Sequence, residues 1–366
     1  MIRTATVTWV KFFNFGSYLQ AYALQQILLQ HGYDNDILND VQIQSERLEK
    51  RHFRSLRMKM SSLKDFLKNR NYFKAKKIIN QKYIVFAEKY LKINSKILPL
   101  SLLNQQYDVF ICGSDQIWHP SLDVFSPYYY LEFATKKKIA YAPSIGTFDY
   151  PEEFIPKVRP LLDRFERISV REKQGAEILS AFMNKEIQAV LDPTLLLERQ
   201  SWEILIKDKP LKREKYILCY FLTPNSWYLD YVRKFAAQKQ LPIKIFGTHS
   251  SYLKWDECIL AGPEDFLDYI YNSEYFFTDS FHGSIFSILF EKRFCTFQRF
   301  ENTERHNQNS RIVHLFSLLG LEEYLIKQTE LDKIEILSPI NYEQVKEKLD
   351  VYRKESLCYL LNALKN

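Results

Sequence analysis

Glycine and cysteine are both scarce in this chain. Only 9 of its 366 residues are glycine, which argues against a glycine-rich repeat or a fibrous protein. The five cysteines are odd in number, widely scattered and without metal-ligand spacing: Cys112, Cys219, Cys258, Cys295 and Cys358. Such a set is typical of reduced thiols in a cytoplasmic protein, most of them packed in the core.

Long apolar runs and the common nucleotide motifs are missing as well. No window reaches the roughly 18 uncharged apolar residues that cross a membrane, and residues 1–9 are too short and too alternating for a secretory signal. We therefore expect a cytoplasmic protein. There is no Walker A motif, no Gly-x-Gly-x-x-Gly and no His-x-x-x-His, so nothing supports a metal or dinucleotide cofactor.

What is present is enough apolar material for two cores. Hydrophobic residues make up 46% of the chain and aromatic residues 15%. At roughly 100–200 residues per domain, the length suggests two domains.

The positive charge is concentrated in one segment. Between Arg47 and Lys92 there are fifteen Lys and Arg residues against three acidic ones, a local net charge of +12 that leaves −5 on the rest of a +7 chain. No nucleic-acid-binding motif accompanies this charge, so we expect no nucleic-acid partner. An anionic membrane surface and a solvated helical face both remain open as explanations.

Hydrophobic periodicity predicts two α/β halves. Strand patterns alternate with helical ones from residue 3 to 191, and the alternation restarts near residue 216. We predict a Rossmann-like lobe over 1–197 with a helical insertion at 42–93, a second doubly wound lobe over 198–340, and a closing helix over 341–366. Ligands of such sheets collect at the carboxyl ends of the strands.

Four of the predicted strand-end loops carry candidate chemistry. The backbone N–H groups of Asn14-Phe15-Gly16-Ser17, before a helix, can meet an anion, or this can be a plain capped turn. Gly113-Ser114-Asp115-Gln116-Ile117-Trp118 offers Asp115 and Gln116 to vicinal hydroxyls and Trp118 to the apolar face of a sugar, or Trp118 belongs to the core.

The other two loops carry an arginine and a histidine. Arg171, at a strand-to-helix junction, can bind a carboxylate or phosphate, or can form a surface ion pair with Glu172. His282 opens a helix after a buried strand, beside Asp279 and Ser280, and Gly283 allows close approach of substrate or backbone. A lone histidine is more often structural than catalytic, and both interpretations stay open here.

Taken together, these loops resemble the polysaccharide pyruvyl transferase family. Six stretches carry the resemblance in order along nearly the whole chain: Asn14 to Gln25, Gly113-Ser114-Asp115-Gln116-Ile117-Trp118, Tyr141-Ala142-Pro143-Ser144-Ile145-Gly146, Ser169-Val170-Arg171-Glu172, Leu191-Asp192-Pro193-Thr194-Leu195-Leu196 and Thr278-Asp279-Ser280-Phe281-His282-Gly283.

The resemblance implies a glycosyltransferase-B-like fold and transfer of the pyruvyl group of phosphoenolpyruvate onto a sugar as a cyclic ketal, without a further cofactor. It implies donor binding by Arg171, Ser280, Gly283 and Arg311, with Arg299, Arg305 and Arg293 as competitors for the last position. It places the acceptor, a sugar or lipid-linked glycan of the cell envelope, at Asn14, Gly16, Ser17, Gln20, Ser114, Asp115, Gln116 and Trp118.

As a mechanism we expect His282 to carry the proton that reaches the enol methylene, because a group with a pKa near 7 suits this task. Asp115 is the candidate base for the attacking hydroxyl. Two alternatives compete: a nucleotide-sugar glycosyltransferase of the same architecture, and a non-catalytic polysaccharide-assembly protein bound to the membrane through its basic segment.

Overall fold

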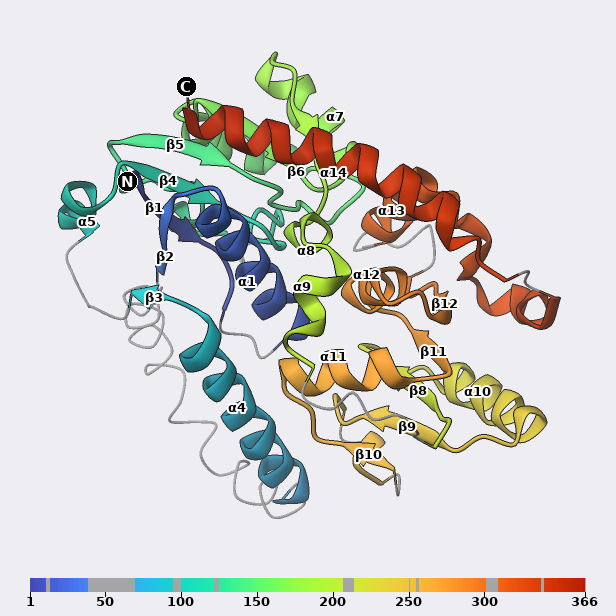
Figure 1. Cartoon of the computed structure of the whole chain (residues 1–366). Coiled ribbons are helices and arrows are strands. Elements are labelled where there is room, and N and C mark those ends of the chain that lie inside the picture. Colours follow the sequence, from blue (N-terminus) through green and yellow to red (C-terminus); the bar gives the residue numbers. More distant parts are fainter. Residues whose placement is uncertain are drawn as a thin grey trace, which may run out of the picture.

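The computed structural model describes residues 1–10, 14–38, 70–94, 100–121, 125–206, 214–249, 251–254, 257–300, 309–336 and 339–365. In these residues the strands form two separate parallel sheets, one in each half of the chain (Figure 1). The predicted pair of doubly wound α/β lobes is therefore confirmed. The boundary between the predicted domains falls between the last strand of the first sheet, which ends at Ala189, and the first strand of the second, which begins at Ile217.

The N-terminal sheet has the strand order β3-β2-β1-β4-β5-β6-β7. Its strands are β1 (Arg3–Val7), β2 (Asp34–Leu38), β3 (Ile93–Asn94), β4 (Val109–Cys112), β5 (Lys137–Ala140), β6 (Arg167–Val170) and β7 (Gln188–Ala189). Every residue of β4 is buried, as expected of a central strand in a parallel sheet covered on both faces. The strand order reverses between β1 and β4, so the loops after these two strands flank the usual ligand position.

The C-terminal sheet repeats this plan with the order β10-β9-β8-β11-β12-β13. Its strands are β8 (Ile217–Tyr220), β9 (Ile243–Phe246), β10 (Cys258–Ile259), β11 (Tyr275–Thr278), β12 (Arg293–Phe297) and β13 (Leu325–Ile326). Here the order reverses between β8 and β11. The segment after β11 holds His282, which places the predicted catalytic residue at the switch point of its sheet.

Helices cover both sheets. The α-helices are α1 (Phe15–Gln30), α4 (Arg70–Tyr90), α5 (Leu100–Gln106), α6 (Ile155–Leu162), α7 (Lys173–Met183), α8 (Pro193–Leu196), α9 (Arg199–Glu203), α10 (Ser226–Lys239), α11 (Pro263–Asn272), α12 (Phe281–Leu289), α13 (Ser310–Leu319) and α14 (Tyr342–Lys365). Short 3₁₀ turns are η1 (Pro127–Tyr130), η2 (Glu152–Phe154), η3 (Tyr252–Lys254), η4 (Glu322–Tyr324) and η5 (Gln328–Ile336).

Helix α1 lies between the two lobes. Thirteen of its sixteen residues are buried, so it has no broad solvent face, as expected of a helix that is apolar all round. Its first residue, Phe15, stacks on Phe266 of α11 with ring centroids 4.4 Å apart. One apolar core cluster therefore contains residues of both lobes, and the N-terminus of α1 is held at their junction.

The last helix ties the lobes together a second time. Figure 1 shows α14 running from α13 back across the N-terminal lobe. The backbone N–H of Leu191 donates to Ser356 Oγ at 3.0 Å, and Arg353 Nε donates to the carbonyl of Leu195 at 2.8 Å. Helix α14 thus contacts both lobes. Three of the five cysteines (Cys112, Cys219 and Cys295) lie in the core as expected.

The basic insertion is only partly described, because residues 39–69 lie outside the described ranges. Helix α4 packs on α11 of the C-terminal lobe, where Lys82 Nζ lies 2.9 Å from Asp265 and Lys89 Nζ 3.4 Å from Glu264. Lys92 pairs with Asp34 at 2.5 Å. Part of the charge thus links elements of the fold, and contact with an anionic membrane stays a prediction. Among the described helices, none is both long and apolar enough for a membrane span.

Candidate active site

Asp192 joins residues from the two lobes. It follows β7 and begins α8, where its Oδ1 accepts hydrogen bonds from the backbone N–H of Thr194 at 3.0 Å and from the Thr194 hydroxyl at 2.6 Å. Its Oδ2 accepts from Arg171 Nη1 at 2.6 Å and lies 3.5 Å from His282 Nε2. One carboxylate oxygen therefore holds an arginine of the N-terminal lobe beside a histidine of the C-terminal lobe.

This cluster is almost closed to solvent. The side chains of Asp192, Arg171 and His282 are 0%, 1% and 9% exposed. Burial alone raises the pKa of a carboxyl group, but the charge and hydrogen bond of His282, followed by the charge of Arg171 and the hydrogen bond from Thr194, hold the pKa of Asp192 well below its usual range. Asp192 is thus a fixed negative charge at neutral pH.

His282 is positioned by the N-terminus of α12 and by Gly16. Ser280 Oγ accepts from the backbone N–H of Gly283 at 3.3 Å and caps the helix. The imidazole packs on Gly16 of α1, where a Cβ atom would stand 1.9 Å from His282 Nδ1. Gly16, predicted to bind the acceptor, therefore meets the predicted catalytic histidine directly.

We expect Gly16→Ala to lower turnover by about 10²-fold, because the added methyl displaces the imidazole and misplacement by about 1 Å can cost that much. Gly16 lies within helix α1, so alanine suits its backbone. Steady-state kinetics with a thermal melt of the same sample test this. Wild-type turnover in a folded Gly16→Ala variant would show that the contact is irrelevant.

Gly283 and Ser280 serve the helix rather than an open site. A Cβ atom on Gly283 would lie 2.5 Å from Thr278 Oγ1, so glycine is needed where α12 crosses β11. The Ser280 hydroxyl is engaged as the helix cap. The expectation that Gly283 admits the donor is replaced by this close approach to the strand.

Arginines surround the cluster. The guanidinium carbons of Arg171 and Arg311 lie 4.7 and 5.6 Å from the centre of the Phe281 ring. Burial lowers the pKa of Arg311 to about 9, and the positive charge of Arg171 adds to this, while Glu172 and Asp115 oppose it. Both guanidinium groups lie against the Phe281 ring, and Arg171 Nε and Nη2 donate to no protein acceptor among the described residues, so these donors are available to an anion.

Arg299 completes the positive region from the loop after β12. Its Nε donates to Thr223 Oγ1 at 2.7 Å. The loop that carries Thr223 is itself held by Asp279, which accepts from the backbone N–H groups of Leu222 at 2.6 Å and Thr223 at 2.9 Å. Arg293 begins β12 at the opposite end of the sheet, and Arg305 lies outside the described residues, so Arg299 and Arg311 are the candidates that the fold brings to this region.

Asp279 makes the stability of the folded protein depend on pH. Burial raises its pKa to about 6, against the lowering effects of the Leu222 N–H and of Arg299. Because the folded-state pKa exceeds the unfolded one, the folded state binds more protons between about pH 4 and 6. The contribution of Asp279 to stability is therefore full below pH 4 and falls as the pH rises through 6.

We expect the unfolding free energy of the wild type to fall by about 3 kcal/mol relative to Asp279→Asn between pH 4 and 7, since each pKa unit corresponds to about 1.4 kcal/mol. Denaturant titrations of both proteins across this range test it. Parallel pH profiles for the two proteins would contradict the assignment.

The predicted acceptor residues of the N-terminal lobe lie together, but several are used internally. Ser17 Oγ donates to Asp115 Oδ2 at 2.5 Å. Gln20 Nε2 donates to Thr8 Oγ1 at 2.8 Å, and its Oε1 accepts from the backbone N–H of Ser114 at 3.1 Å. These bonds join the ends of β1 and β4 to α1, so Gln20 and Ser114 shape the loop from within.

Three other acceptor candidates differ in what they can reach. Asn14 caps α1 by accepting from the backbone N–H of Gly16 at 2.9 Å. Gln116 Nε2 is enclosed beside Gly146 and has no hydrogen-bond partner in the described part of the chain, so it is able to meet a ligand. Trp118 is only 1% exposed and stacks on Tyr130 at 5.3 Å, which corrects the expectation that it packs on a sugar.

Two acidic residues were missed as site residues. Asp192 belongs to one of the six matching stretches, but an Asp before Pro and Thr is typical of a helix cap, so the sequence patterns assigned it no role in the site. Glu172 does not pair with Arg171: its Oε1 accepts from Ser144 Oγ and from the backbone N–H groups of Ile145 and Gly146 at 2.9–3.0 Å. The strand-end position of both residues was the available signal.

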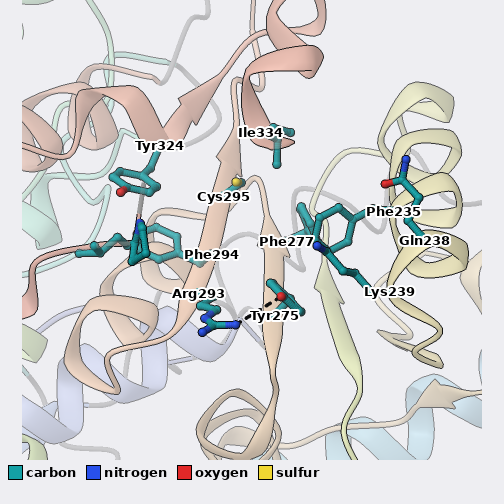
Figure 2. A pocket seen from close by; sticks show the side chains of 12 residues that line it. Phe235, Gln238, Lys239, Tyr275, Phe277, Arg293, Phe294, Cys295, Tyr324 and Ile334 are labelled. Atoms are coloured by element: carbon teal, nitrogen blue, oxygen red, sulfur yellow. Dashed lines mark hydrogen bonds between the residues drawn. The ribbon is translucent and has the colours of Figure 1, made fainter. Parts of the chain in front are cut away.

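A separate cavity of about 570 Å³ lies between α10 and strands β11 and β12 of the C-terminal lobe (Figure 2). It is lined by Tyr275 and Arg293, the first residues of β11 and β12, and by Phe235 of α10. These strand starts are at the opposite edge of the sheet from His282. We therefore do not assign the chemistry to this cavity. In the described ranges, no cluster of three or more His, Cys, Asp or Glu is arranged to hold a metal ion.

Comparison with known families decides the relationship. The model of the family described as polysaccharide pyruvyl transferase matches residues 14–299. The chain belongs to the polysaccharide pyruvyl transferase family. The matched range includes Gly16, Arg171, Asp192 and His282 and ends at Arg299. As a member of this family the chain is a transferase. No curated protein sequence matches it.

Solved structures show the same fold at low sequence identity. The S. aureus MnaA–UDP co-structure is 11% identical with a TM-score of 0.54, over 95% of this chain and 91% of that one. The UDP-GlcNAc 2-epimerase from Neisseria meningitidis bound to UDP-GlcNAc is also 11% identical, with a TM-score of 0.54 and full coverage of both chains. These similarities confirm the glycosyltransferase-B-like architecture of this pyruvyl transferase family member.

Proposed function

We propose that this enzyme transfers the pyruvyl group of phosphoenolpyruvate onto a sugar of a cell-surface polysaccharide or its precursor, forming a ketal and releasing phosphate. The observation that carries the proposal is the sharing of Asp192 Oδ2 by Arg171 and His282, which come from different lobes. Family membership supports the reaction type.

The charges suit the donor. Phosphoenolpyruvate carries a phosphate and a carboxylate, and planar guanidinium groups bind such anions through paired donors. Arg171 and Arg311 flank Phe281, and Arg299 is held nearby by Thr223. Asp192 neutralises one positive charge and fixes Arg171, which leaves the remaining donors of that arginine for the anion.

The proposed steps use His282 as the proton carrier. Its Nδ1 packs against Gly16, so Nε2, which lies 3.5 Å from Asp192 Oδ2, is the nitrogen that we assign to the substrate. A proton goes to the methylene carbon of the enol, and C2 becomes oxocarbenium-like. A sugar hydroxyl forms a C–O bond to C2 and loses its proton, for which Asp115 is the candidate base.

The remaining steps release phosphate and close the ketal. The bond between C2 and the phosphate oxygen breaks, and phosphate leaves with the electron pair. A second hydroxyl then forms its own bond to C2 and gives up its proton. No carbon is oxidised or reduced overall, so the proposal needs no redox cofactor. We place the reaction in the cytoplasm, with a sugar or lipid-linked glycan as acceptor.

The competing function is nucleotide-sugar transfer on the same architecture; the two structural neighbours named above hold UDP and UDP-GlcNAc. A thermal-shift comparison of phosphoenolpyruvate with UDP-GlcNAc separates the two. At 100 times its dissociation constant a ligand of the native state stabilises by about 2.7 kcal/mol. We expect this shift with phosphoenolpyruvate, its loss in Arg311→Ala, and its retention in Arg159→Ala, an exposed arginine of α6. Stabilisation by UDP-GlcNAc alone would overturn the proposal.

A further inference from the structure

A second cavity, of about 420 Å³, lies at the carboxyl ends of the C-terminal strands next to the active-site cluster. Its walls come from the loop before α1, from α4, and from the ends of β8, β9 and β10. In Figure 1, α4 runs beside α11. Helix α4 contributes the lining residues Tyr72, Ala75, Lys76, Ile79, Asn80 and Tyr83. The volume falls in the range of about 300–1,000 Å³ that is typical of small-molecule sites.

The inner wall of this cavity is aromatic and preformed. Phe15, Tyr83, Tyr220 and Phe246 line it and are between 1% and 4% exposed. The Phe15 ring lies 5.3–5.6 Å from the rings of the other three. Such packing fixes the wall before any ligand arrives, so binding requires little reorganisation.

Polar groups stand around this wall. Asn14, Lys76, Asn80 and Thr248 all line the cavity and are at least partly exposed. Asn80 Oδ1 is enclosed but accepts no hydrogen bond among the described residues. An enclosed carbonyl oxygen without a donor is costly unless a ligand supplies one. An apolar wall with a few polar groups is the usual composition of a ligand pocket.

The cavity touches the active-site cluster through three lining residues. Asn14 accepts from the backbone N–H of Gly16, on which His282 packs. The side chain of Tyr220 interacts with that of Ser280, the cap of the helix that carries His282. Leu222 donates its backbone N–H to Asp279. A molecule in the cavity is thus separated from the reacting groups by single residues.

We infer that this cavity is a sugar-ring subsite, and that it binds a pyranose ring of the acceptor. A pyranose presents apolar C–H faces to the partly exposed side chains of Tyr72 and Ile79, which line the cavity in front of the buried aromatic wall, and hydroxyl donors to acceptors such as Asn80 Oδ1. A nucleoside diphosphate fits less well, because Lys76 is the only basic residue of the described lining. The identification of the ring as part of the acceptor rests on the proposed function, whereas binding of a pyranose does not.

The test uses the full chain and saturation-transfer NMR with three probes: methyl glucopyranoside, methyl galactopyranoside and methyl mannopyranoside. Ala75 lines the cavity and Ala75→Phe fills it. Ile78→Phe is the matched control, because Ile78 belongs to the same helix, is 49% exposed and does not line the cavity. We expect saturation transfer to at least one probe in wild type and Ile78→Phe, and its loss in Ala75→Phe. Asn80→Leu, which keeps the volume and removes the acceptor, is expected to weaken binding about tenfold.

Three results would overturn the subsite. These are no saturation transfer to any probe in wild type, undiminished saturation transfer in folded Ala75→Phe and Asn80→Leu, or displacement of the probe by UDP. The thermal shift with phosphoenolpyruvate is measured on the same samples and is expected to survive in Ala75→Phe. If wild type binds a pyranoside but not phosphoenolpyruvate, the proposed reaction fails while the subsite stands.

Discussion

Replacing His282 with alanine is expected to lower turnover by about 10²–10⁴-fold, the usual contribution of a positioned acid–base group. The imidazole lies 3.5 Å from Asp192 Oδ2 and against Gly16, so it is held in one orientation. His282→Ala removes the proton carrier but leaves Arg171, Arg299 and Arg311 in place. Phosphate release from phosphoenolpyruvate in the presence of acceptor gives the rate.

The control for this variant is His249→Ala, because His249 is exposed and lies on the loop after β9. It is expected to keep wild-type turnover. Retained binding of phosphoenolpyruvate by His282→Ala, measured by thermal shift, would place the loss in the chemical step. Full activity of a folded His282→Ala protein would remove the histidine from the mechanism.

Removing Asp192 is expected to have the largest effect on the fold. Asp192→Ala leaves Arg171 buried without its counter-ion, and breaking a buried pair in this way costs about 3–5 kcal/mol. It also removes the cap of α8, which Asp192 Oδ1 provides through Thr194. Chemical denaturation measures the loss. Asp230→Ala, on the solvent face of α10, is the control and is expected to change stability by no more than about 0.5 kcal/mol.

Asp192→Asn separates stability from catalysis. The amide keeps the shape of the side chain but no longer offers a negative charge to both Arg171 and His282. We expect turnover to fall by at least about 10²-fold in a protein that still folds. Wild-type turnover in Asp192→Asn, or a loss of less than 1 kcal/mol in Asp192→Ala, would contradict the role of Asp192 as the link between the lobes.

Sequence patterns predicted the meeting of Arg171 and His282 because strand ends are visible in a sequence. Each residue follows a strand of its own sheet, and ligands of doubly wound sheets collect at the carboxyl ends of the strands, so a site shared by the two lobes requires these ends to converge. The patterns did not identify Asp192 as the residue that joins them. Its two carboxylate oxygens do different things, and only the cap on Thr194 is a local interaction that a sequence displays.

The surroundings of Trp118 and Gly283 could not be predicted from the sequence patterns. A tryptophan after a strand end can face a sugar or the core, and the choice depends on Tyr129 and Tyr130, which supply a carbonyl at 3.0 Å and a stacking partner. A glycine at a helix start can admit a ligand or a strand, and Thr278 decides this for Gly283. The position of Trp118 depends on Tyr129 and Tyr130, which no motif contains, and that of Gly283 depends on a close approach to Thr278 that the order of the motif residues does not show.

The contact of α4 with the C-terminal lobe was also beyond the sequence. Charge counting marks the segment as basic, but the pairing of Lys82 with Asp265 and of Lys89 with Glu264 joins residues more than 170 positions apart. Only the tertiary fold shows that Lys82 and Lys89 hold α4 against α11, beside the aromatic cavity.

A crystal structure with phosphoenolpyruvate bound tests the central claim most directly. We predict that its phosphate and carboxylate lie within about 3 Å of guanidinium groups of Arg171, Arg299 and Arg311, with the His282 ring beside the methylene carbon. Density for the donor elsewhere, such as in the cavity between α10 and the starts of β11 and β12, would contradict the account.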